Sequence, residues 1–169
     1  MSGDGALTRR AMDATTPSAP PAGGIADGVL PATYGEVLRP LDLAALPAPL
    51  AALHRDSPVF RDWLHAWDRT MRAEKVSSWT TWTEPERRAW DAGDVVAFSR
   101  LRGYTETEIA EFLRYLELTA MLDAEHPDDP DFTFCALHDV LDTLRTPAYD
   151  ALDAHLQSIS STPPPPLQP

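Results

Sequence analysis

Three side chains that could take part in catalysis stand at helical spacing near the C-terminal end of the sequence. Cys135, His138 and Asp142 occupy positions i, i+3 and i+7, so a helix would turn them toward a common side. A thiol beside an imidazole can act as a nucleophile with its base, and all three groups are also metal ligands. No second ligand pair occurs at a usable spacing, so the favoured interpretation is a buried cysteine beside a surface histidine. We take these residues as the candidate catalytic group and predict no metal site and no cofactor.

The five tryptophans form a second group, between Trp63 and Trp90. Trp63 and Trp67 lie one helical turn apart on an apolar stripe, which is typical of a core helix. Trp79 and Trp82 belong to the segment SSWTTWTE, which the sequence predicts as a loop. Their indoles either close the core or form an aromatic surface that anchors a partner, since buried tryptophan is a favoured anchor in interfaces. Trp79 and Trp82 are therefore candidate partner-binding residues.

Charge is distributed unevenly along the chain, whose net charge is −12. Residues 1–102 carry twelve basic and thirteen acidic side chains, whereas residues 103–169 carry two basic and thirteen acidic ones. The acidic part is either a solvated surface or a surface that attracts a basic partner. The carboxylates that we assign to such a partner-binding surface are those of Glu106, Glu111, Asp128, Asp129 and Asp131.

One stretch of the chain resembles a DNA-binding motif. The run VVAFSRLRGYTETEIAEFL, residues 95–113, is similar to the first half of a helix-turn-helix in sigma-factor-like regulators, with RxxG followed by a T/SxxEIA helix. This resemblance implies a transcriptional regulator. After Leu113, however, the chain continues as RYLELTAMLDAEHPDD, without a breaker or a basic recognition helix. Binding duplex DNA requires several basic side chains on one face. We therefore expect an ordinary packing helix and no direct contact with nucleic acid.

Composition restricts the class of protein. A length of 169 residues favours one domain. No run reaches the roughly 18 apolar residues of a membrane span, and the N-terminal stretch lacks the apolar region of a secretory signal. The single cysteine is typical of a reducing compartment, and thirteen arginines against one lysine suggest a GC-rich bacterial genome. These features favour a cytoplasmic bacterial protein without a membrane partner.

Capping signals and apolar periodicity divide the chain into helices. Short apolar and striped segments predict helical pieces at about 41–53, 58–75, 84–102, 105–126, 130–145 and 147–159, with a bend in the third at Gly93-Asp94. Ser57-Pro58, Asp129-Pro130 and Thr146-Pro147 each place a capping side chain before a proline, and Thr83 and Thr105 begin capping boxes. No segment shows the period-two alternation of a strand.

The expected architecture is an all-α, compact bundle of about five to six helices. Residues 1–38 form a disordered or extended tail, residues 39–158 the helical domain, and residues 159–169 a proline-rich tail. The function that we expect is that of a non-enzymatic acidic interaction module, such as an adaptor, inhibitor or accessory subunit. Its partner would be a protein that is basic or binds nucleic acid. A small helical enzyme that uses Cys135, His138 and Asp142 and a helix-turn-helix regulator are the alternatives.

Overall fold

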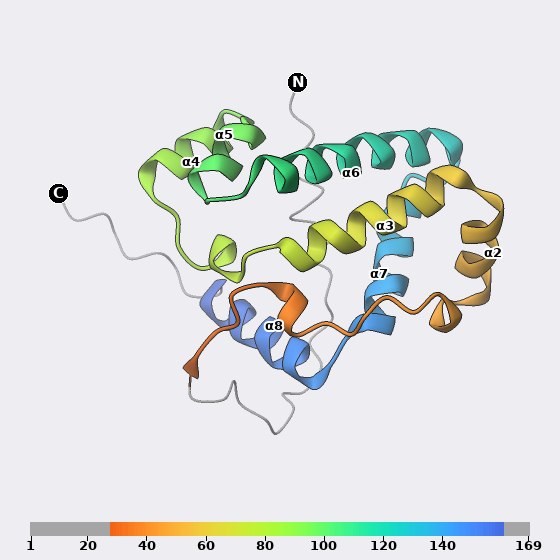
Figure 1. Cartoon of the computed structure of the whole chain (residues 1–169), viewed down its shortest axis with the longest axis horizontal. Helices are drawn as coiled ribbons and strands as arrows, with labels where there is room; N and C mark the ends of the chain where they lie inside the picture. The colour runs from red at the N-terminus through yellow and green to blue at the C-terminus, as the bar shows by residue number, and fades with distance from the viewer. Residues whose placement is uncertain (1–27, 161–169) are drawn as a thin grey trace.

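The structure of the protein is a computed structural model that describes residues 28–160. This part of the chain contains seven α-helices, short 3-10 helices and no strand, which confirms the predicted all-α class. Helices α3 (Pro58–Ala73) and α6 (Glu106–Glu125) lie side by side as the two longest elements (Figure 1). The others are α2 (Ala48–Asp56), α4 (Glu84–Asp91), α5 (Val95–Leu101), α7 (Phe132–Leu144) and α8 (Pro147–Ser160), with the 3-10 helices η2 (Tyr34–Glu36), η3 (Leu43–Ala45) and η4 (Val76–Trp79).

Helix α3 lies at the centre of the core, and most of the apolar side chains along its stripe are buried. Ser57 caps its first turn by accepting a hydrogen bond from the backbone N–H of Phe60. Phe60, Trp63 and Leu64 are fully buried, and the Trp63 indole N–H donates to the Thr119 hydroxyl of α6 at 3.1 Å. Burial of a large aromatic side chain with its one polar atom paired is a strong source of stability. This contact holds α3 against α6.

Residues 28–38, which the sequence predicts as part of the N-terminal tail, lie against the helices. Tyr34 is only 1% exposed, and its ring packs at 6.2 Å from that of Tyr149 on α8. Its backbone N–H donates to the carbonyl oxygen of Glu74 at 3.1 Å. An aromatic side chain buried by distant helices leaves no periodic signal in its own segment. Residues 1–27 and 161–169, which contain the rest of both predicted tails, lie outside the described residues.

The predicted helix over residues 84–102 is two helices, α4 and α5, instead of one bent helix. Gly93 has a φ of 70°, a left-handed conformation that ends α4. Asp94 then caps α5 through its side chain, which accepts from the backbone N–H of Ala97 at 2.9 Å. The two short helices pack on each other at the end of the molecule where α3 ends and α6 begins (Figure 1).

The first turns of the other helices can be compared with the capping residues predicted for them. Thr83 and Thr105 both form complete capping boxes, and Thr146 accepts from the backbone N–H of Tyr149, as predicted. The start predicted at Asp129-Pro130 is wrong, because α7 begins at Phe132. Two successive turns occupy the intervening residues, with the carbonyls of His126 and Asp129 accepting from backbone N–H groups three residues on. None of the helices in residues 28–160 has the length and apolar character needed to cross a bilayer.

Candidate binding pocket

A cavity of about 260 Å³ lies between the C-terminal half of α3, η4, the α4–α5 pair and the N-terminal half of α6. We call it the aromatic pocket. Six aromatic side chains line it, those of Trp79, Trp82, Trp90, Phe98, Tyr104 and Phe112. Its volume is just below the range of roughly 300–1,000 Å³ that is typical of sites for drug-sized ligands. The aromatic pocket therefore has room for a small molecule or for one side chain of a partner.

Three aromatic rings form one wall of the pocket and join α4 to α5. The ring centroids of Trp82, Trp90 and Phe98 lie 5.1 to 5.2 Å apart in tilted and edge-to-face arrangements. Such geometry is the favoured one for aromatic pairs. The Trp82 indole N–H donates to the carbonyl oxygen of Ser78, which fixes this ring relative to η4. The wall is therefore preorganised before any ligand enters.

An ion pair shielded from solvent fixes the same wall from behind. Arg102 donates to the Glu86 carboxylate at 3.2 Å, and the two side chains are 7% and 9% exposed. The Glu86 carboxylate also accepts from the backbone N–H of Thr83, and this bond, together with Arg102, lowers the pKa of Glu86. Arg102 donates in addition to the carbonyl oxygen of Thr81. One carboxylate thus caps α4 and holds the end of α5.

Glu74, which follows α3, supplies a carboxyl group to the pocket lining. Burial raises its pKa from an ordinary value near 4.5 to about 7, because a charged carboxylate is poorly solvated there. The Trp79 indole N–H and the positive charge of Arg102 oppose this effect in part. The Trp79 N–H does not reach the geometry of an ordinary hydrogen bond. At neutral pH the Glu74 carboxyl is therefore poised between its neutral and charged forms.

Two polar atoms of the pocket residues, one of them the Trp79 N–H, lack hydrogen-bond partners within residues 28–160. The Thr70 hydroxyl and the Trp79 indole N–H are buried and make no hydrogen bond within residues 28–160. Both residues line the cavity. Buried polar atoms are nearly always paired in native proteins, so each exception calls for an explanation. Both atoms border the cavity, so the polar group of a ligand there could bind to them.

The predicted partner-binding residues are not brought together into one surface. Trp79, Trp82 and Glu111 line the aromatic pocket, with the two indoles partly buried rather than presented on the surface. Asp128, Asp129 and Asp131 lie in the α6–α7 turn, at the opposite end of α6 (Figure 1). A helix of this length separates its two ends by roughly 30 Å. The tryptophans and the aspartates therefore belong to different regions of the molecule.

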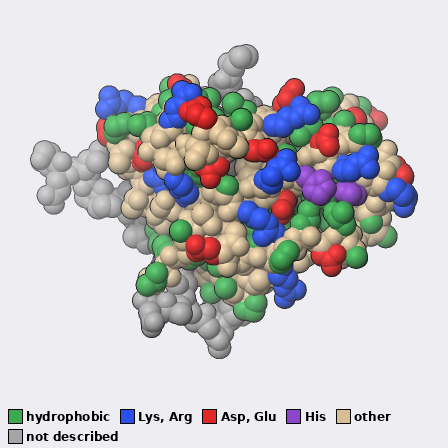
Figure 2. Space-filling view, viewed as in Figure 1, with side chains coloured by type: hydrophobic (Ala, Val, Ile, Leu, Met, Phe, Trp, Pro, Cys, Tyr) green, Lys and Arg blue, Asp and Glu red, His purple; other side chains and the backbone are tan. Residues whose placement is uncertain are grey.

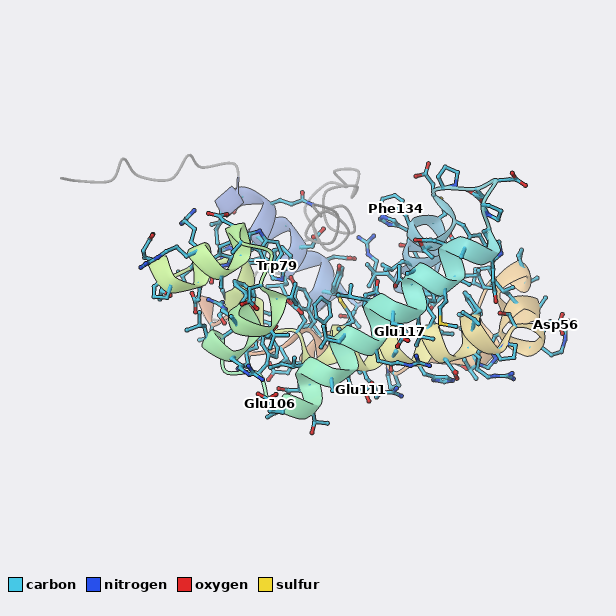
Figure 3. The ribbon with its side chains drawn as sticks, turned by 90° about the horizontal axis from the view of Figure 1, so that it is seen from above. Asp56, Trp79, Glu106, Glu111, Glu117 and Phe134 are labelled. Atoms are coloured by element: carbon cyan, nitrogen blue, oxygen red, sulfur yellow. The ribbon has the colours of Figure 1, made fainter. Side chains whose placement is uncertain are left out.

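Two of the predicted acidic residues on α6 are paired with arginines from the first part of the chain. Arg100 donates to Glu106 at 2.7 Å, and Arg69 donates to Glu111 at 2.9 Å. Figure 3 shows that Glu106, Glu111 and Glu117 are spaced along α6. Figure 2 shows acidic and basic side chains interspersed over the face that it presents. Glu106 and Glu111 are therefore largely neutralised by these arginines and add little to an acidic surface, and their role in binding a partner stays a prediction.

Negative charge without an arginine or lysine partner remains at the α6–α7 turn. Asp128, Asp129 and Asp131 are exposed, and none of them forms an ion pair with another residue in the described part of the chain. Glu125 at the end of α6 accepts only a hydrogen bond, from the Ser57 hydroxyl at 3.4 Å. These carboxylates contribute a local negative field but no geometry of a binding site.

The candidate catalytic group on α7 is not organised for catalysis. Cys135 is exposed, and within residues 28–160 no hydrogen bond links it to His138. The His138 ring contacts Phe134 at 4.6 Å, and its Nε2 is buried without a partner. Asp142 faces Arg145 at 3.5 Å instead of the histidine. Over the same described residues, no group of three potential ligands could hold a metal ion. Cys135, His138 and Asp142 thus have the predicted helical spacing, but in the described residues they lack the hydrogen bonds to one another that would activate the thiol.

The stretch that resembles a helix-turn-helix contains no second helix of that motif. Helix α6 runs without interruption from Glu106 to Glu125, so no turn follows Leu113. Its last turn carries no basic side chain. The capping chemistry of Thr105 and Glu108 explains the likeness, because any helix that begins with a capping box uses the same residues. Residues 95–113 form α5, a turn and the first part of a packing helix.

Several pocket residues were not identified from the sequence. Trp90 and Phe98 fall within the helix predicted over residues 84–102, and together with Trp82 they place three aromatic residues around the predicted bend, a signal that could have indicated a small separate cluster. Glu74 and Thr70 give no sequence signal, since their roles come from burial. Comparisons with models of known protein families, with curated proteins and with solved structures give no match.

Proposed function

We propose that this chain is a non-enzymatic binding module that anchors a basic protein partner in the aromatic pocket. The observation that carries the proposal is the position of Trp79 and Trp82 beside the Glu74 carboxyl around an unfilled cavity. Aromatic faces attract cations, and a carboxylate provides a counter-charge. A side chain with an apolar stem and a positive end would satisfy both features.

The remaining negative charge supports a basic partner. The net charge of the chain is −12, and the carboxylates of Asp128, Asp129 and Asp131 have no partner in the described residues. Such a field increases the rate at which a positively charged protein approaches, while the pocket provides the specific contact. An adaptor, an inhibitor or an accessory subunit of a nucleic-acid-binding protein would use charge and anchorage in this way.

A differential capture experiment tests this proposal. The immobilised full chain is exposed to a lysate of cells that express it, at low and at high salt, beside the variants Ala73→Leu and Glu117→Gln. Ala73 lines the cavity, so the larger leucine would occupy space that the partner needs. Glu117 is an exposed α6 residue paired with Arg114 and serves as the control.

We expect one basic protein to be retained by the wild type and by Glu117→Gln, lost with Ala73→Leu, and released by high salt. Circular dichroism would show that Ala73→Leu is folded. Retention of the same proteins by all three chains, or equal retention at both salt concentrations, would overturn the proposal.

A further inference from the structure

We infer that the aromatic pocket binds an organic ammonium ion that carries an alkyl or aromatic stem, with the Glu74 carboxylate as its counter-ion. This assignment deepens the proposed function and rests on it, since a lysine side chain of a basic partner and a free amine share this chemistry. Four features of the pocket select a cation with an apolar stem over a neutral or anionic ligand: its lining, its charge balance, its unpaired polar atoms and its protonation.

The lining accounts for the apolar stem. The walls consist mainly of aromatic rings together with aliphatic side chains such as Val95 and Ile109. A strongly hydrated ion such as ammonium itself would lose its water there without enough replacement contacts. An alkyl or aryl group gains from removal of apolar surface from water, and the cationic end gains from the aromatic faces.

The arginines around the pocket are each paired with a carboxylate, and the carboxylates that remain unpaired leave it with a net negative charge. On the lining, Arg69 is neutralised by Glu111 at 2.9 Å, and behind the wall Arg102 is neutralised by Glu86 at 3.2 Å. The carboxylates of Glu74 and Glu108 have no ion-pair partner within residues 28–160, although Glu108 accepts from the backbone N–H of Thr105. A cation is therefore favoured over an anion of the same shape.

Lys75, which follows Glu74 in the chain, is a further cation near the pocket whose contacts fix its position. Its ammonium group donates to the carbonyl oxygens of Arg102 and Gly103, both at 2.9 Å, and lies 4.9 Å from the Tyr104 ring centroid. Lys75 does not line the cavity. Because those two carbonyls bind the Lys75 ammonium group, it forms no ion pair with Glu74, and the Glu74 carboxyl can pair with a ligand. The contact with Tyr104 shows that the fold already places an ammonium group against an aromatic ring.

The unpaired polar atoms match an ammonium ligand and an ionised Glu74. An ammonium group is a donor only, and it can donate to both the Glu74 carboxylate and the Thr70 hydroxyl oxygen. The Trp79 indole N–H is also a donor only, so its natural acceptor is the Glu74 carboxylate itself. An entering ammonium ion would therefore give the Thr70 hydroxyl a donor, and the ionised Glu74 carboxylate would be a stronger acceptor for the Trp79 N–H.

Ligand binding should be linked to the release of a proton from Glu74. Because burial raises the pKa of this carboxyl to about 7, part of it is neutral at neutral pH, and a cation stabilises only the charged form. The groups that face Glu74 are Trp79, Arg102, Tyr104 and Tyr34, and burial raises the pKa of Tyr104 to about 12. Glu74 is thus the member of this set that titrates near neutrality, and affinity should rise with pH from about 6 to 8.

The experiment is a titration of the full chain with three probes of similar shape: n-hexylammonium, n-hexanol and hexanoate. Tryptophan fluorescence and calorimetry would report binding to the wild type, to Glu74→Gln and to the control Glu117→Gln. At about pH 8 we expect the ammonium probe to bind the wild type about tenfold more tightly than hexanol. This preference should persist in Glu117→Gln and disappear in Glu74→Gln, which keeps the shape of the side chain but not its charge.

The pH dependence provides a second readout. Lowering the pH from about 8 to about 6 should weaken hexylammonium binding to the wild type on the order of tenfold, and should leave hexanol binding unchanged. Equal affinities for hexylammonium and hexanol, tighter binding of hexanoate, or a preference for the ammonium probe that survives in Glu74→Gln would overturn the inference.

The two proposals fail in distinguishable ways. If no amine binds but a partner protein is still lost with Ala73→Leu, the pocket receives an apolar side chain, and only the cation assignment falls. If hexylammonium binds with the expected preference but capture reveals no basic protein, the proposed protein partner falls and the pocket is a site for a free amine. A peptide with lysine, compared with the same peptide with norleucine, separates the two sources of the ammonium group.

Discussion

Tryptophan occupies two contrasting environments in this molecule. In the core, Trp63 is fully buried, its indole N–H donates to Thr119 at 3.1 Å, and its ring lies 5.5 Å from that of Phe60. At the aromatic pocket, Trp79 is partly exposed, its N–H has no hydrogen-bond partner in the described residues, and a cavity of about 260 Å³ adjoins it.

The different environments of the two tryptophans indicate that one region stabilises the fold and the other is suited to binding. A closed core with paired polar atoms gains from dispersion and from removal of apolar surface from water. A cavity bordered by unpaired polar atoms lacks part of the dispersion energy and part of the free energy of apolar burial. This loss is offset only when a ligand occupies the cavity. We therefore expect substitutions in the core to act mainly on unfolding, and substitutions at the pocket to act mainly on ligand binding.

The largest expected effect comes from truncating a tryptophan in the core. Trp63→Ala should lower the free energy of unfolding by about 3–5 kcal/mol, because it leaves a large hole between α3 and α6. Trp79→Ala should lower it by about 1–2 kcal/mol, because that ring is already beside a cavity. Urea denaturation followed by circular dichroism measures both. Equal losses would contradict the contrast between the two regions.

The next effect concerns the ion pair behind the pocket wall. Arg102→Met removes the cation that pairs with Glu86 while keeping most of the side-chain volume. It should lower the free energy of unfolding by about 2–3 kcal/mol, because it leaves a shielded carboxylate without its partner. The exposed pair of Arg100 with Glu106 is the control, and Arg100→Ala should cause no measurable change in the urea midpoint. A similar loss in both variants would show that shielding of the pair is unimportant.

Glu74→Gln should stabilise the protein at alkaline pH. Below about pH 4.5 the carboxyl is neutral in the folded and the unfolded chain. As the pH rises toward about 7, the unfolded carboxyl ionises while the folded one keeps its proton, so the stability of the wild type declines. The variant lacks this decline and should be about 2–3 kcal/mol more stable than the wild type at pH 8, since one pKa unit corresponds to about 1.4 kcal/mol. Thermal unfolding at about pH 5 and 8 measures the difference, and an effect that is the same at both values would exclude this origin.

The smallest expected effect comes from removing only the indole N–H group. Trp79→Phe should change the free energy of unfolding by less than about 1 kcal/mol, because that N–H has no hydrogen bond to lose. Trp63→Phe should cost about 1–2 kcal/mol, because the bond to Thr119 is lost along with some packing. Urea denaturation measures both variants. A larger loss of unfolding free energy in Trp79→Phe than in Trp63→Phe would contradict the contrast between the two regions.

Local features of the fold could be predicted because they depend on neighbouring residues. The caps at Ser57, Thr83 and Thr105 each involve a side chain and a backbone N–H three residues on, so the sequence contains both partners. The break at Gly93 was located for the same reason, although its result was two helices instead of a bend. The start of α7 was missed because turns at residues 126–131, and not the aspartate–proline signal, decide where it begins.

The candidate site was predicted only in part. Trp79, Trp82 and Glu111 are predicted binding residues, and all three line the pocket. Glu111 is paired with Arg69, however, and Glu74, the carboxyl group that we assign to a ligand, gives no signal in the sequence. The pairing of Arg69 with Glu111 joins residues on two different helices. No local pattern indicates which arginine a carboxylate will meet, so charge counted along the chain overstated the acidity of α6.

The all-α class, the main helix starts and the apolar face of each helix follow from the order of residues along the chain, because their spacing on a helix fixes which side chains share a face. What each face meets depends on how the helices pack together. This packing placed Trp63 against a complete layer of side chains and Trp79 beside a cavity, and it left Glu74 partly buried beside the same cavity at the end of α3. Burial and pairing arise between distant segments, and these contacts turn an ordinary glutamate and a set of aromatic rings into a candidate binding site.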